Sequence, residues 1–366
     1  MEWREFCFLR TPSKKFTIHH FEKNSSMASA SKKIIAVVGA TGNQGGSVAR
    51  TFLALPEWHV RCLTRNPSSK ASQDLVSLGA EVVQADMNSE SSMSNAFKDV
   101  HAIFLNTDFW ETYRPLAVGA SPTNPDEPSP SIIAFEREVF HGKNAALAAS
   151  TVPTLERLVY SALLPAGKLS HGKYVHSYHW ESKAAIVEFL KREVPELAKK
   201  TSEIYLGAYT TNALLMPRPD PASGKFTFIS PLSAQTRIPI IDPTGSTGPF
   251  VRALIESEPA GTRLLAYDSY PTMSEAVDIW RRASGKEVSF HVMPIQKMVE
   301  VLGIPIEVLD GVGFIEEFGY MGGEKVTEPD ALSTKVNTKS FEEWTMERDW
   351  KEVLEAGAQM MKSVGK

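Results

Sequence analysis

The chain has 366 residues, more than a single hydrophobic core usually organises, so we expect one large domain with an added lobe, or two domains. Hydrophobic residues make up 42% and charged residues 22%, yet no apolar run approaches the roughly 18 residues that cross a bilayer, which excludes a membrane span. A net charge of −4 without a long basic run argues against direct binding of nucleic acid, so we expect small-molecule partners.

The first segment, residues 1–32, mixes acidic and basic side chains and has no apolar region of the signal-peptide kind. We expect a disordered leader or a mis-set start codon, with Met27 as the natural start; a weak targeting peptide is the alternative. The only two cysteines, Cys7 and Cys62, have no spacing that suits a disulfide framework or a metal site. These features predict a cytoplasmic protein, or a nuclear one if it is a regulator.

Short apolar runs then alternate with amphipathic stretches of helical spacing. This alternation predicts an α/β fold: a Rossmann-type, doubly wound parallel sheet that is covered by helices on both faces. The expected strands are "IIAVVG" (34–39), "HVRCLTR" (59–65), "AEVVQAD" (80–86) and "HAIFLNT" (101–107), and the expected helices are 45–55, 70–78 and 90–98.

A surface loop rich in proline, serine and acidic residues is expected at 119–131. Residues 33–206 are expected to form an NAD(P)-binding Rossmann domain. Beyond it, a hairpin signal at Ser223-Gly224 and proline-rich sequence predict a smaller, discontinuous α+β substrate-binding lobe over 207–366, with a segment near 238–256 returning to the Rossmann sheet. The remaining expected elements are helices 131–150 and 181–192 and strands 156–163 and 201–209.

Three glycines follow the first expected strand in the stretch "IIAVVGATGNQGG". Gly39, Gly42 and Gly45 stand at G-x-x-G-x-x-G spacing between a strand and an amphipathic helix. Glycine permits a turn with positive φ and lets backbone amides approach a pyrophosphate, while the helix directs its free N–H groups toward the phosphates. The pattern predicts a nucleotide site; a purely structural tight turn is the alternative.

The end of the second expected strand indicates which dinucleotide binds. An NAD site usually has an acidic residue about 20 positions after the glycines, to bind the ribose hydroxyls. Here the sequence reads "CLTRNPSSK", with Arg65 and then Lys70 and no acid between them. A guanidinium can bind a 2′-phosphate with two hydrogen bonds. We therefore predict NADP(H) rather than NAD; a solvated strand end is the alternative for Arg65.

These segments, "VVGATGNQGGSVARTFLA", "VRCLTRNP", "GAEVVQADMNS" and "VHAIFLNT", resemble the NmrA-like family of atypical short-chain dehydrogenases, which is related to isoflavone reductase-like enzymes. The resemblance extends from about residue 34 to about 300 and is strongest before residue 110. It implies a role for each of several positions in cofactor binding. They are Thr41, Asn43 and Gln44 at the pyrophosphate, Arg65 and Lys70 at the adenosine phosphate, Asp86 and Met87 at the adenine edge, and Asn106 and Thr107 near the nicotinamide.

A typical short-chain dehydrogenase carries Tyr-x-x-x-Lys on a helix, where the lysine lowers the tyrosine pKa and holds the ribose. The corresponding window reads "HGKYVHSYHWESKAAIVEF", and its nearest match is His179-x-x-x-Lys183. Tyr178 is one position too early and is rotated about 100° away on a helix, and Tyr174 is farther upstream. The tyrosine of the pair is therefore absent.

The resemblance accounts for this departure, because NmrA-like proteins generally lack the tyrosine while isoflavone reductase-like relatives keep the lysine and reduce substrates. It implies that Lys183 anchors the nicotinamide ribose and acts with His179 as proton donor, and that Ser161 binds a substrate carbonyl. The alternative is that Lys183 only anchors the cofactor and His179 is a packed residue at a helix start. No histidine has a partner at metal-ligand spacing, so we predict no metal.

Two functions follow. The first is an NADP(H)-dependent oxidoreductase that reduces a carbonyl or conjugated C=C of a small, aromatic or polyketide-like secondary metabolite. The second is a non-catalytic NADP-binding redox sensor or transcriptional co-regulator that acts through a protein partner. Five aromatic side chains are expected either to receive a flat substrate or to belong to the core: Phe109, Trp110, Trp180, Tyr205 and Tyr209.

Overall fold

The computed structural model describes residues 32–118, 128–219 and 225–350. The expected leader before residue 32, most of the expected loop 119–131 and the expected turn at Ser223-Gly224 lie outside these described residues.

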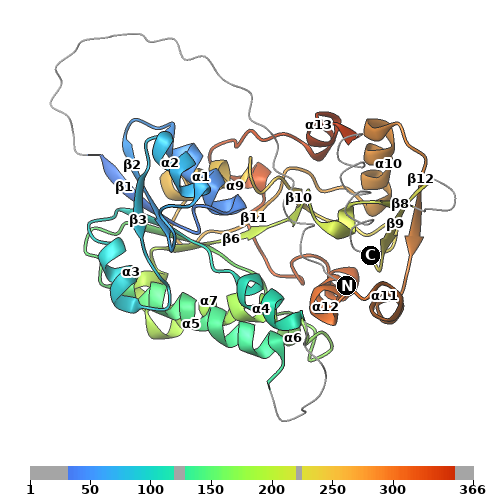
Figure 1. The fold of residues 1–366 in the computed structure, drawn as a ribbon, viewed down its shortest axis with the longest axis horizontal. Helices are drawn as coiled ribbons and strands as arrows, with labels where there is room; N and C mark the ends of the chain where they lie inside the picture. The colour runs from blue at the N-terminus through green and yellow to red at the C-terminus, as the bar shows by residue number, and fades with distance from the viewer. Residues whose placement is uncertain (1–31, 119–127, 220–224, 351–366) are drawn as a thin grey trace, which may run out of the picture.

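A seven-stranded, entirely parallel sheet forms the centre of the molecule, with strand order β11-β6-β5-β4-β1-β2-β3 (Figure 1). The order reverses direction between β1 and β4, which is the switch point of a doubly wound sheet. The predicted Rossmann-type α/β fold is confirmed. The strands are β1 (Lys33–Val38), β2 (Trp58–Thr64), β3 (Glu81–Gln84), β4 (Ala102–Leu105), β5 (Arg157–Ser161), β6 (Thr201–Leu206) and β11 (Arg263–Ala266).

Helices cover both faces of this sheet because its strands carry apolar side chains on both sides. In β1, Ile35 and Val37 pack with α1 and α9, whereas Ala36 and Val38 point to the cluster that contains α3, α5 and α7. The helices that precede β6 are followed in this group by α9, which precedes β11. They are α1 (Asn43–Leu53), α2 (Lys70–Ser77), α3 (Glu90–Ala96), α4 (Phe109–Ala117), α5 (Pro130–Ser150), α6 (Ala166–Leu169), α7 (Tyr178–Glu193), α8 (Pro195–Ala198) and α9 (Thr247–Glu256).

The chain beyond β6 builds two small sheets and further helices. β10 pairs with β7, and β9 pairs with β8 and β12. A return to the large sheet was expected near 238–256; the strand that joins its edge is β11, shortly after that range, whereas β10 lies in a small sheet. These elements are β7 (Ala208–Tyr209), η1 (Ala213–Leu215), β8 (Arg218–Pro219), β9 (Phe226–Ser230), β10 (Ile240–Ile241), α10 (Met273–Ser284), β12 (Val288–Val292), α11 (Ile295–Leu302), α12 (Ile306–Phe318), η2 (Pro329–Ala331) and α13 (Phe341–Met346).

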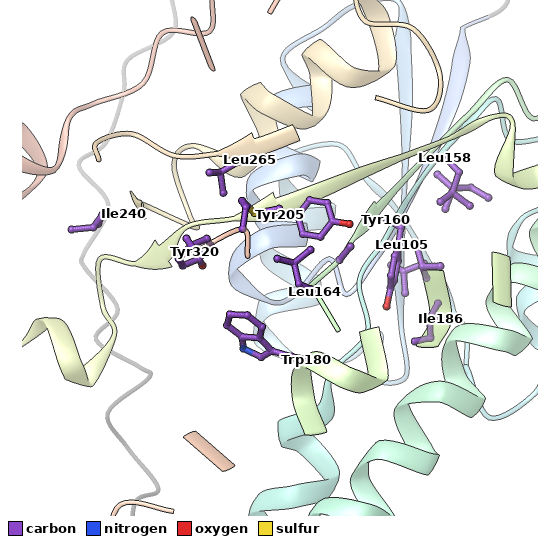
Figure 2. Packing of buried hydrophobic residues seen from close by; sticks show 14 of the residues in the cluster. Leu105, Leu158, Tyr160, Leu164, Trp180, Ile186, Tyr205, Ile240, Leu265 and Tyr320 are labelled. Atoms are coloured by element: carbon purple, nitrogen blue, oxygen red, sulfur yellow. The ribbon is translucent and has the colours of Figure 1, made fainter. Parts of the chain in front are cut away.

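We call the elements β7–β10, α10–α13 and β12 the lobe. One hydrophobic cluster contains buried residues of both the large sheet and this lobe. Figure 2 shows Tyr160 of β5 beside Leu105, with Ile186 of α7 close by. Nearer the lobe, the hydroxyl of Tyr320 donates to the carbonyl of Leu206 at 2.7 Å. Since lobe and sheet share buried contacts, the lobe is held against the carboxyl ends of the strands.

Candidate cofactor-binding and active site

The glycine turn has the geometry that the sequence predicts. Gly39, directly after β1, adopts φ +73, and a Cβ on Gly45 would lie 2.3 Å from the carbonyl oxygen of Gly39. Only glycine at residue 45 therefore lets α1 pack so closely on the turn. Helix α1 begins at Asn43 with no side-chain cap, so its first N–H groups are available to an anionic ligand.

The turn lies at the switch point of the sheet, where ligands of doubly wound folds bind. Strand β4, which pairs with β1, ends beside it and brings Asn106 close: a Cβ on Gly39 would lie 3.8 Å from the Asn106 side-chain nitrogen. The structure thus brings the predicted pyrophosphate loop and the predicted nicotinamide approach together at one sheet edge.

The polar residues of the loop differ in their surroundings. Thr41 and Asn43 are exposed, as groups that contact a bound ligand must be. Gln44 is half-buried and donates from Nε2 to the hydroxyl of Tyr209 at 2.5 Å, which ties the loop to strand β7. Its Oε1 is buried and has no hydrogen-bond partner among the described residues.

A cavity of about 370 Å³ lies at the expected adenosine end of the site. Arg65 and Asp86 both line it, whereas Lys70 does not; Lys70 is exposed and pairs with Asp74 at 3.1 Å. The backbone N–H of Asn88 donates a hydrogen bond to Asp86, and this bond lowers the pKa of the Asp86 carboxyl although burial acts in the opposite direction. The cavity is lined by Arg65, Gln84, Ala85, Asp86 and Ser92.

Two neighbours of this cavity are also positioned by contacts from helices. Met87 is half-buried, and its carbonyl accepts a hydrogen bond from the Asn144 side chain at 2.8 Å. The guanidinium of Arg65 forms an ion pair with Glu111 of α4, and both side chains are exposed. A 2′-phosphate at Arg65 would meet a cation that already has a carboxylate partner.

Lys183 lies in the second turn of α7 and is held by three acceptors. Its Nζ donates to the carbonyl of Thr107 at 2.8 Å, lies 3.2 Å from Thr107 Oγ1, and forms an ion pair with Glu138 Oε1 at 3.0 Å. The Lys183 side chain is 12% exposed and that of Glu138 is 0% exposed. The hydroxyls of Thr107 and Ser182 also donate to Glu138. The ammonium group therefore has two hydrogen-bond acceptors on Thr107 and a carboxylate partner within the protein.

Glu138 was missed by the sequence analysis, which treated helix 131–150 as an ordinary amphipathic element. A weak signal was present: Glu138 is four residues after Ala134 and seven before Ala145, both of which are buried. An acidic residue on the buried face of a helix needs a cationic partner, because an unpaired buried charge is very unfavourable.

His179 is held by a carboxylate from the lobe. Its backbone N–H donates to Glu307 Oε1 at 2.9 Å, and its ring Nδ1 lies 2.7 Å from the same oxygen. The ring packs on Trp110, with centroids 4.8 Å apart. Helix α7 begins at Tyr178, three residues before the expected start, and Ser177 provides no side-chain cap, so Glu307 serves as the cap.

No tyrosine approaches Lys183 from the positions that were considered. Tyr178 packs edge-on against Phe135 of α5, at 6.0 Å between ring centroids, and the Tyr174 hydroxyl donates to Glu317 at 2.9 Å. A different tyrosine lies nearby: the Tyr160 hydroxyl is 3.4 Å from Thr107 Oγ1. Tyr160 is fully buried, and burial raises its pKa well above the usual value, so it is a poor proton donor to a substrate.

The remaining predicted residues divide between site and core. Ser161 is buried at the end of β5, which pairs with β4. Trp180 and Tyr205 are 7% and 3% exposed, and they belong to the hydrophobic core. Trp110 is half-buried and stays beside His179, in contact with the rings of Phe109 and Tyr113.

Residues 32–118, 128–219 and 225–350 contain neither a cluster of metal-ligating side chains nor a helix that could span a membrane. No group of three or more histidine, cysteine, aspartate or glutamate side chains in these ranges is arranged to hold a metal ion. None of the helices in these ranges combines the length and apolar character needed to cross a membrane.

A model of the NmrA-like family matches residues 31–354. Among similar proteins, the NmrA-like family domain-containing oxidoreductase ptmS of Penicillium ochrochloron is 28% identical over 323 residues, which cover 81% of this chain and 88% of that protein. The corresponding oxidoreductase cpsB of Aspergillus campestris is 52% identical over 83 residues, and this match spans only 24% of that protein and 23% of this chain.

Solved structures share the fold at low sequence identity. NmrA, described as a negative transcriptional regulator, in complex with NAD has a TM-score of 0.67 and 21% identity, with 90% of this chain and 98% of that chain covered. Leucoanthocyanidin reductase from Vitis vinifera, as its complex with NADPH, has a TM-score of 0.61 and 14% identity, with 85% and 98% covered.

Proposed function

The chain belongs to the NmrA-like family, as the resemblance predicted, and from that premise we propose that it is an NADP(H)-dependent reductase. Its substrate would be a small, largely apolar molecule with a carbonyl or a conjugated C=C. The observation that carries this proposal is the continuous set of contacts at the switch point: the glycine turn adjoins Asn106, and Lys183 donates to the next residue, Thr107.

The residues present fit a dinucleotide. The turn has glycine at 39, 42 and 45 where α1 begins, and the cavity with Arg65 and Asp86 lies beyond the end of β2. Thr41 and Asn43 would contact the pyrophosphate, Arg65 the 2′-phosphate, and Asn106 the nicotinamide side. When bound, NADPH would supply the hydride; the protein would supply orientation and a proton.

His179 is the better proton donor of the two predicted catalytic residues. Reduction of a carbonyl places negative charge on oxygen, which a proton must neutralise. Lys183 donates two hydrogen bonds to Thr107 and is paired with Glu138, so it would serve to position the ribose after exchanging one of these contacts. His179 has one ring nitrogen engaged with Glu307, and no hydrogen bond from a described residue occupies Nε2.

A substrate ring would pack near His179. Trp110 and Tyr113 are half-buried there and contact each other and the buried Phe109. Aromatic side chains of this kind favour flat, apolar ligands through offset and edge-to-face contacts. This arrangement supports the aromatic class of substrate.

A non-catalytic NADP sensor that acts through a protein partner is the second candidate. Two observations favour it: Lys183 already has partners within the protein, and no tyrosine stands at the position of the usual proton donor. NmrA, which shares the fold, is described as a transcriptional regulator.

Two measurements separate these candidates. The first is a titration with NADPH and NADH, followed by nicotinamide fluorescence. The second is incubation of the NADPH complex with aromatic ketones and enones. We expect tight NADPH binding and loss of the reduced-nicotinamide absorbance with at least one compound. Binding without oxidation across a wide panel would favour the sensor instead.

Replacement of Arg65 tests the cofactor assignment. Arg65→Ala should weaken NADPH binding by roughly tenfold to a hundredfold, since charge-assisted hydrogen bonds contribute about 1.5–3 kcal/mol, and should change NADH binding little. Lys70→Ala is the matched control, because this exposed cation does not line the cavity. Equal losses for the two dinucleotides in Arg65→Ala would contradict the assignment of Arg65 to the 2′-phosphate.

A further inference from the structure

We propose that Glu307 is a positioning residue that holds one proton of His179 on Nδ1 and thereby directs Nε2, which carries the second proton of the imidazolium form, to the substrate. This inference rests on the proposed function, because it gives His179 its orientation as the proton donor. Glu307 lies in the first turn of α12, in the lobe, and is 128 residues from His179 in sequence.

The contacts fix both the ring and the backbone of His179. A single oxygen, Glu307 Oε1, accepts from the His179 backbone N–H at 2.9 Å and lies 2.7 Å from ring Nδ1. The hydroxyl of Ser177 donates to the Glu307 carbonyl at 3.2 Å. Because an ionised carboxylate can only accept hydrogen bonds, Nδ1 must carry the proton in this geometry.

The remaining surroundings restrict the ring further. The ring contacts Trp110 in a tilted arrangement with 4.8 Å between centroids, and the His179 side chain is 15% exposed. The ring can therefore not turn over to exchange Nδ1 for Nε2 without losing both the carboxylate and the aromatic contact. Nε2 is left as the nitrogen that meets a substrate. It donates from the doubly protonated ring, which then becomes neutral and keeps its remaining proton on Nδ1.

Glu307 does more than a helix cap requires. Its side chain is 2% exposed, and its second oxygen, Oε2, is buried without a partner among the described residues. A half-satisfied buried carboxylate is unfavourable for stability. A shorter or neutral cap would serve the helix without that penalty, so the carboxylate indicates a task at the ring.

Asp310, one turn later on α12, provides the internal comparison. It accepts from the backbone N–H of His176 at 2.6 Å, so it too satisfies a donor near the start of α7. The His176 ring is 54% exposed and lies 3.5 Å from Asp310, so it is only loosely paired. Of these two carboxylates, Glu307 is the one that holds a nearly buried ring.

The first test is the nitrogen-15 spectrum of histidine-labelled full-length protein, with the His179 signals assigned from their loss in His179→Gln. We expect a protonated Nδ1 in the wild type. A neutral ring with its proton on Nε2 would overturn the proposal without the need for any variant.

The second test compares variants. Glu307→Leu should abolish the preference for a protonated Nδ1 and lower kcat by roughly tenfold or more, with the Kd for NADPH unchanged. Glu307→Gln, which keeps an acceptor oxygen, should retain most of the preference and of kcat, and the control Asp310→Asn should leave the His179 signals unchanged. An unaltered tautomer in Glu307→Leu, or an equal change in Asp310→Asn, would overturn the proposal.

The ring spectrum and the substrate assay distinguish a failure of this proposal from a failure of the proposed function. If no substrate is reduced but the His179 signals respond to Glu307→Leu as expected, the positioning contact stands and the reductase assignment fails. If substrate is reduced and the ring signals do not respond, the positioning role fails and the reductase assignment stands.

Discussion

Lys183 and Glu138 form a buried ion pair at the point where the candidate site meets the interior. From sequence, Lys183 resembles a ribose anchor, whereas the structure shows it hydrogen-bonded to Thr107 and paired with Glu138. A pair of this kind contributes little net stability, yet the loss of one partner leaves an uncompensated charge. Lys183 is therefore both a candidate site residue and a structural one.

Single replacement of Lys183 should destabilise the protein. We expect Lys183→Met to lower the free energy of unfolding by about 3–5 kcal/mol, because Glu138 would stay buried without a cation. The double variant Lys183→Met/Glu138→Gln should recover a large part of this loss. Urea unfolding of both variants measures the loss and its recovery.

The control for this measurement is Lys70→Ala, whose exposed pair with Asp74 should be dispensable. If Lys183→Met were as stable as the wild type, Glu138 would not depend on Lys183 for its charge compensation. Activity should be compared in the double variant, where a loss of turnover is not confounded by loss of folded protein.

Helices α5 and α7 together place Glu138 and Lys183 opposite one another. The close approach depends on Gly142 of α5, where a Cβ would lie 2.3 Å from Cδ1 of Ile186 in α7. Glycine is retained in a helix at this point despite its low helix propensity. Both helices are predictable from the sequence, but their separation is not, because it depends on two residues that are 44 positions apart in sequence.

Gly142→Ala should therefore force these two helices apart. We expect a loss of about 1–3 kcal/mol in the free energy of unfolding, typical of overpacking. With Ile186→Ala in the same chain, the loss should be smaller than the sum of the two single losses, since the clash is relieved. Thermal or urea unfolding of the three variants gives the coupling.

Gly167→Ala is the comparison for this effect, because its nearest neighbour would be at 3.4 Å, which is ordinary contact. Strict additivity of Gly142→Ala and Ile186→Ala would show that the helices do not limit each other's approach.

At the scale of the whole molecule, Glu203 of β6 joins parts that are distant in sequence. It pairs with Lys191 of α7 at 2.7 Å, with Arg263 of β11 at 3.2 Å and with the hydroxyl of Tyr205 at 2.5 Å. Burial alone would raise the pKa of Glu203, but the hydrogen bonds from Lys191 and Tyr205 outweigh it and lower that pKa.

A lowered folded-state pKa makes this contribution to stability dependent on pH. The stabilisation is present above the unfolded-state pKa, about 4.3 for glutamate, and is lost as the pH falls through the lower folded-state value. Glu203→Gln should hence be less stable than the wild type at pH 7, and this difference should shrink as the pH falls below about 5. Urea unfolding at several pH values measures the difference.

Glu196→Gln serves as the control, because Glu196 is exposed and pairs only with Lys199 three residues away. A stability difference for Glu203→Gln that stayed constant down to pH 3 would show that the charge of Glu203 does not stabilise the fold.

The sequence by itself determined the local features of this protein. Strand and helix periodicity, the three glycines and the Arg65 segment are patterns within short windows, and each reports a backbone conformation or a surface that nearby residues are able to produce. These patterns predict the Rossmann-type sheet, the family and the place of the glycine turn. All three predictions agree with the fold and the comparisons.

Only the tertiary structure decided how the site is completed. Glu138 reaches Lys183 across a helix pair, Glu307 reaches His179 from the lobe, and β11 joins the sheet after a long excursion of the chain. These partners are 45, 128 and about 60 residues apart, and no periodicity in a single sequence records which buried charge meets which donor. Their pairing follows from the requirement that buried polar groups find partners, which the folded chain satisfies as a whole.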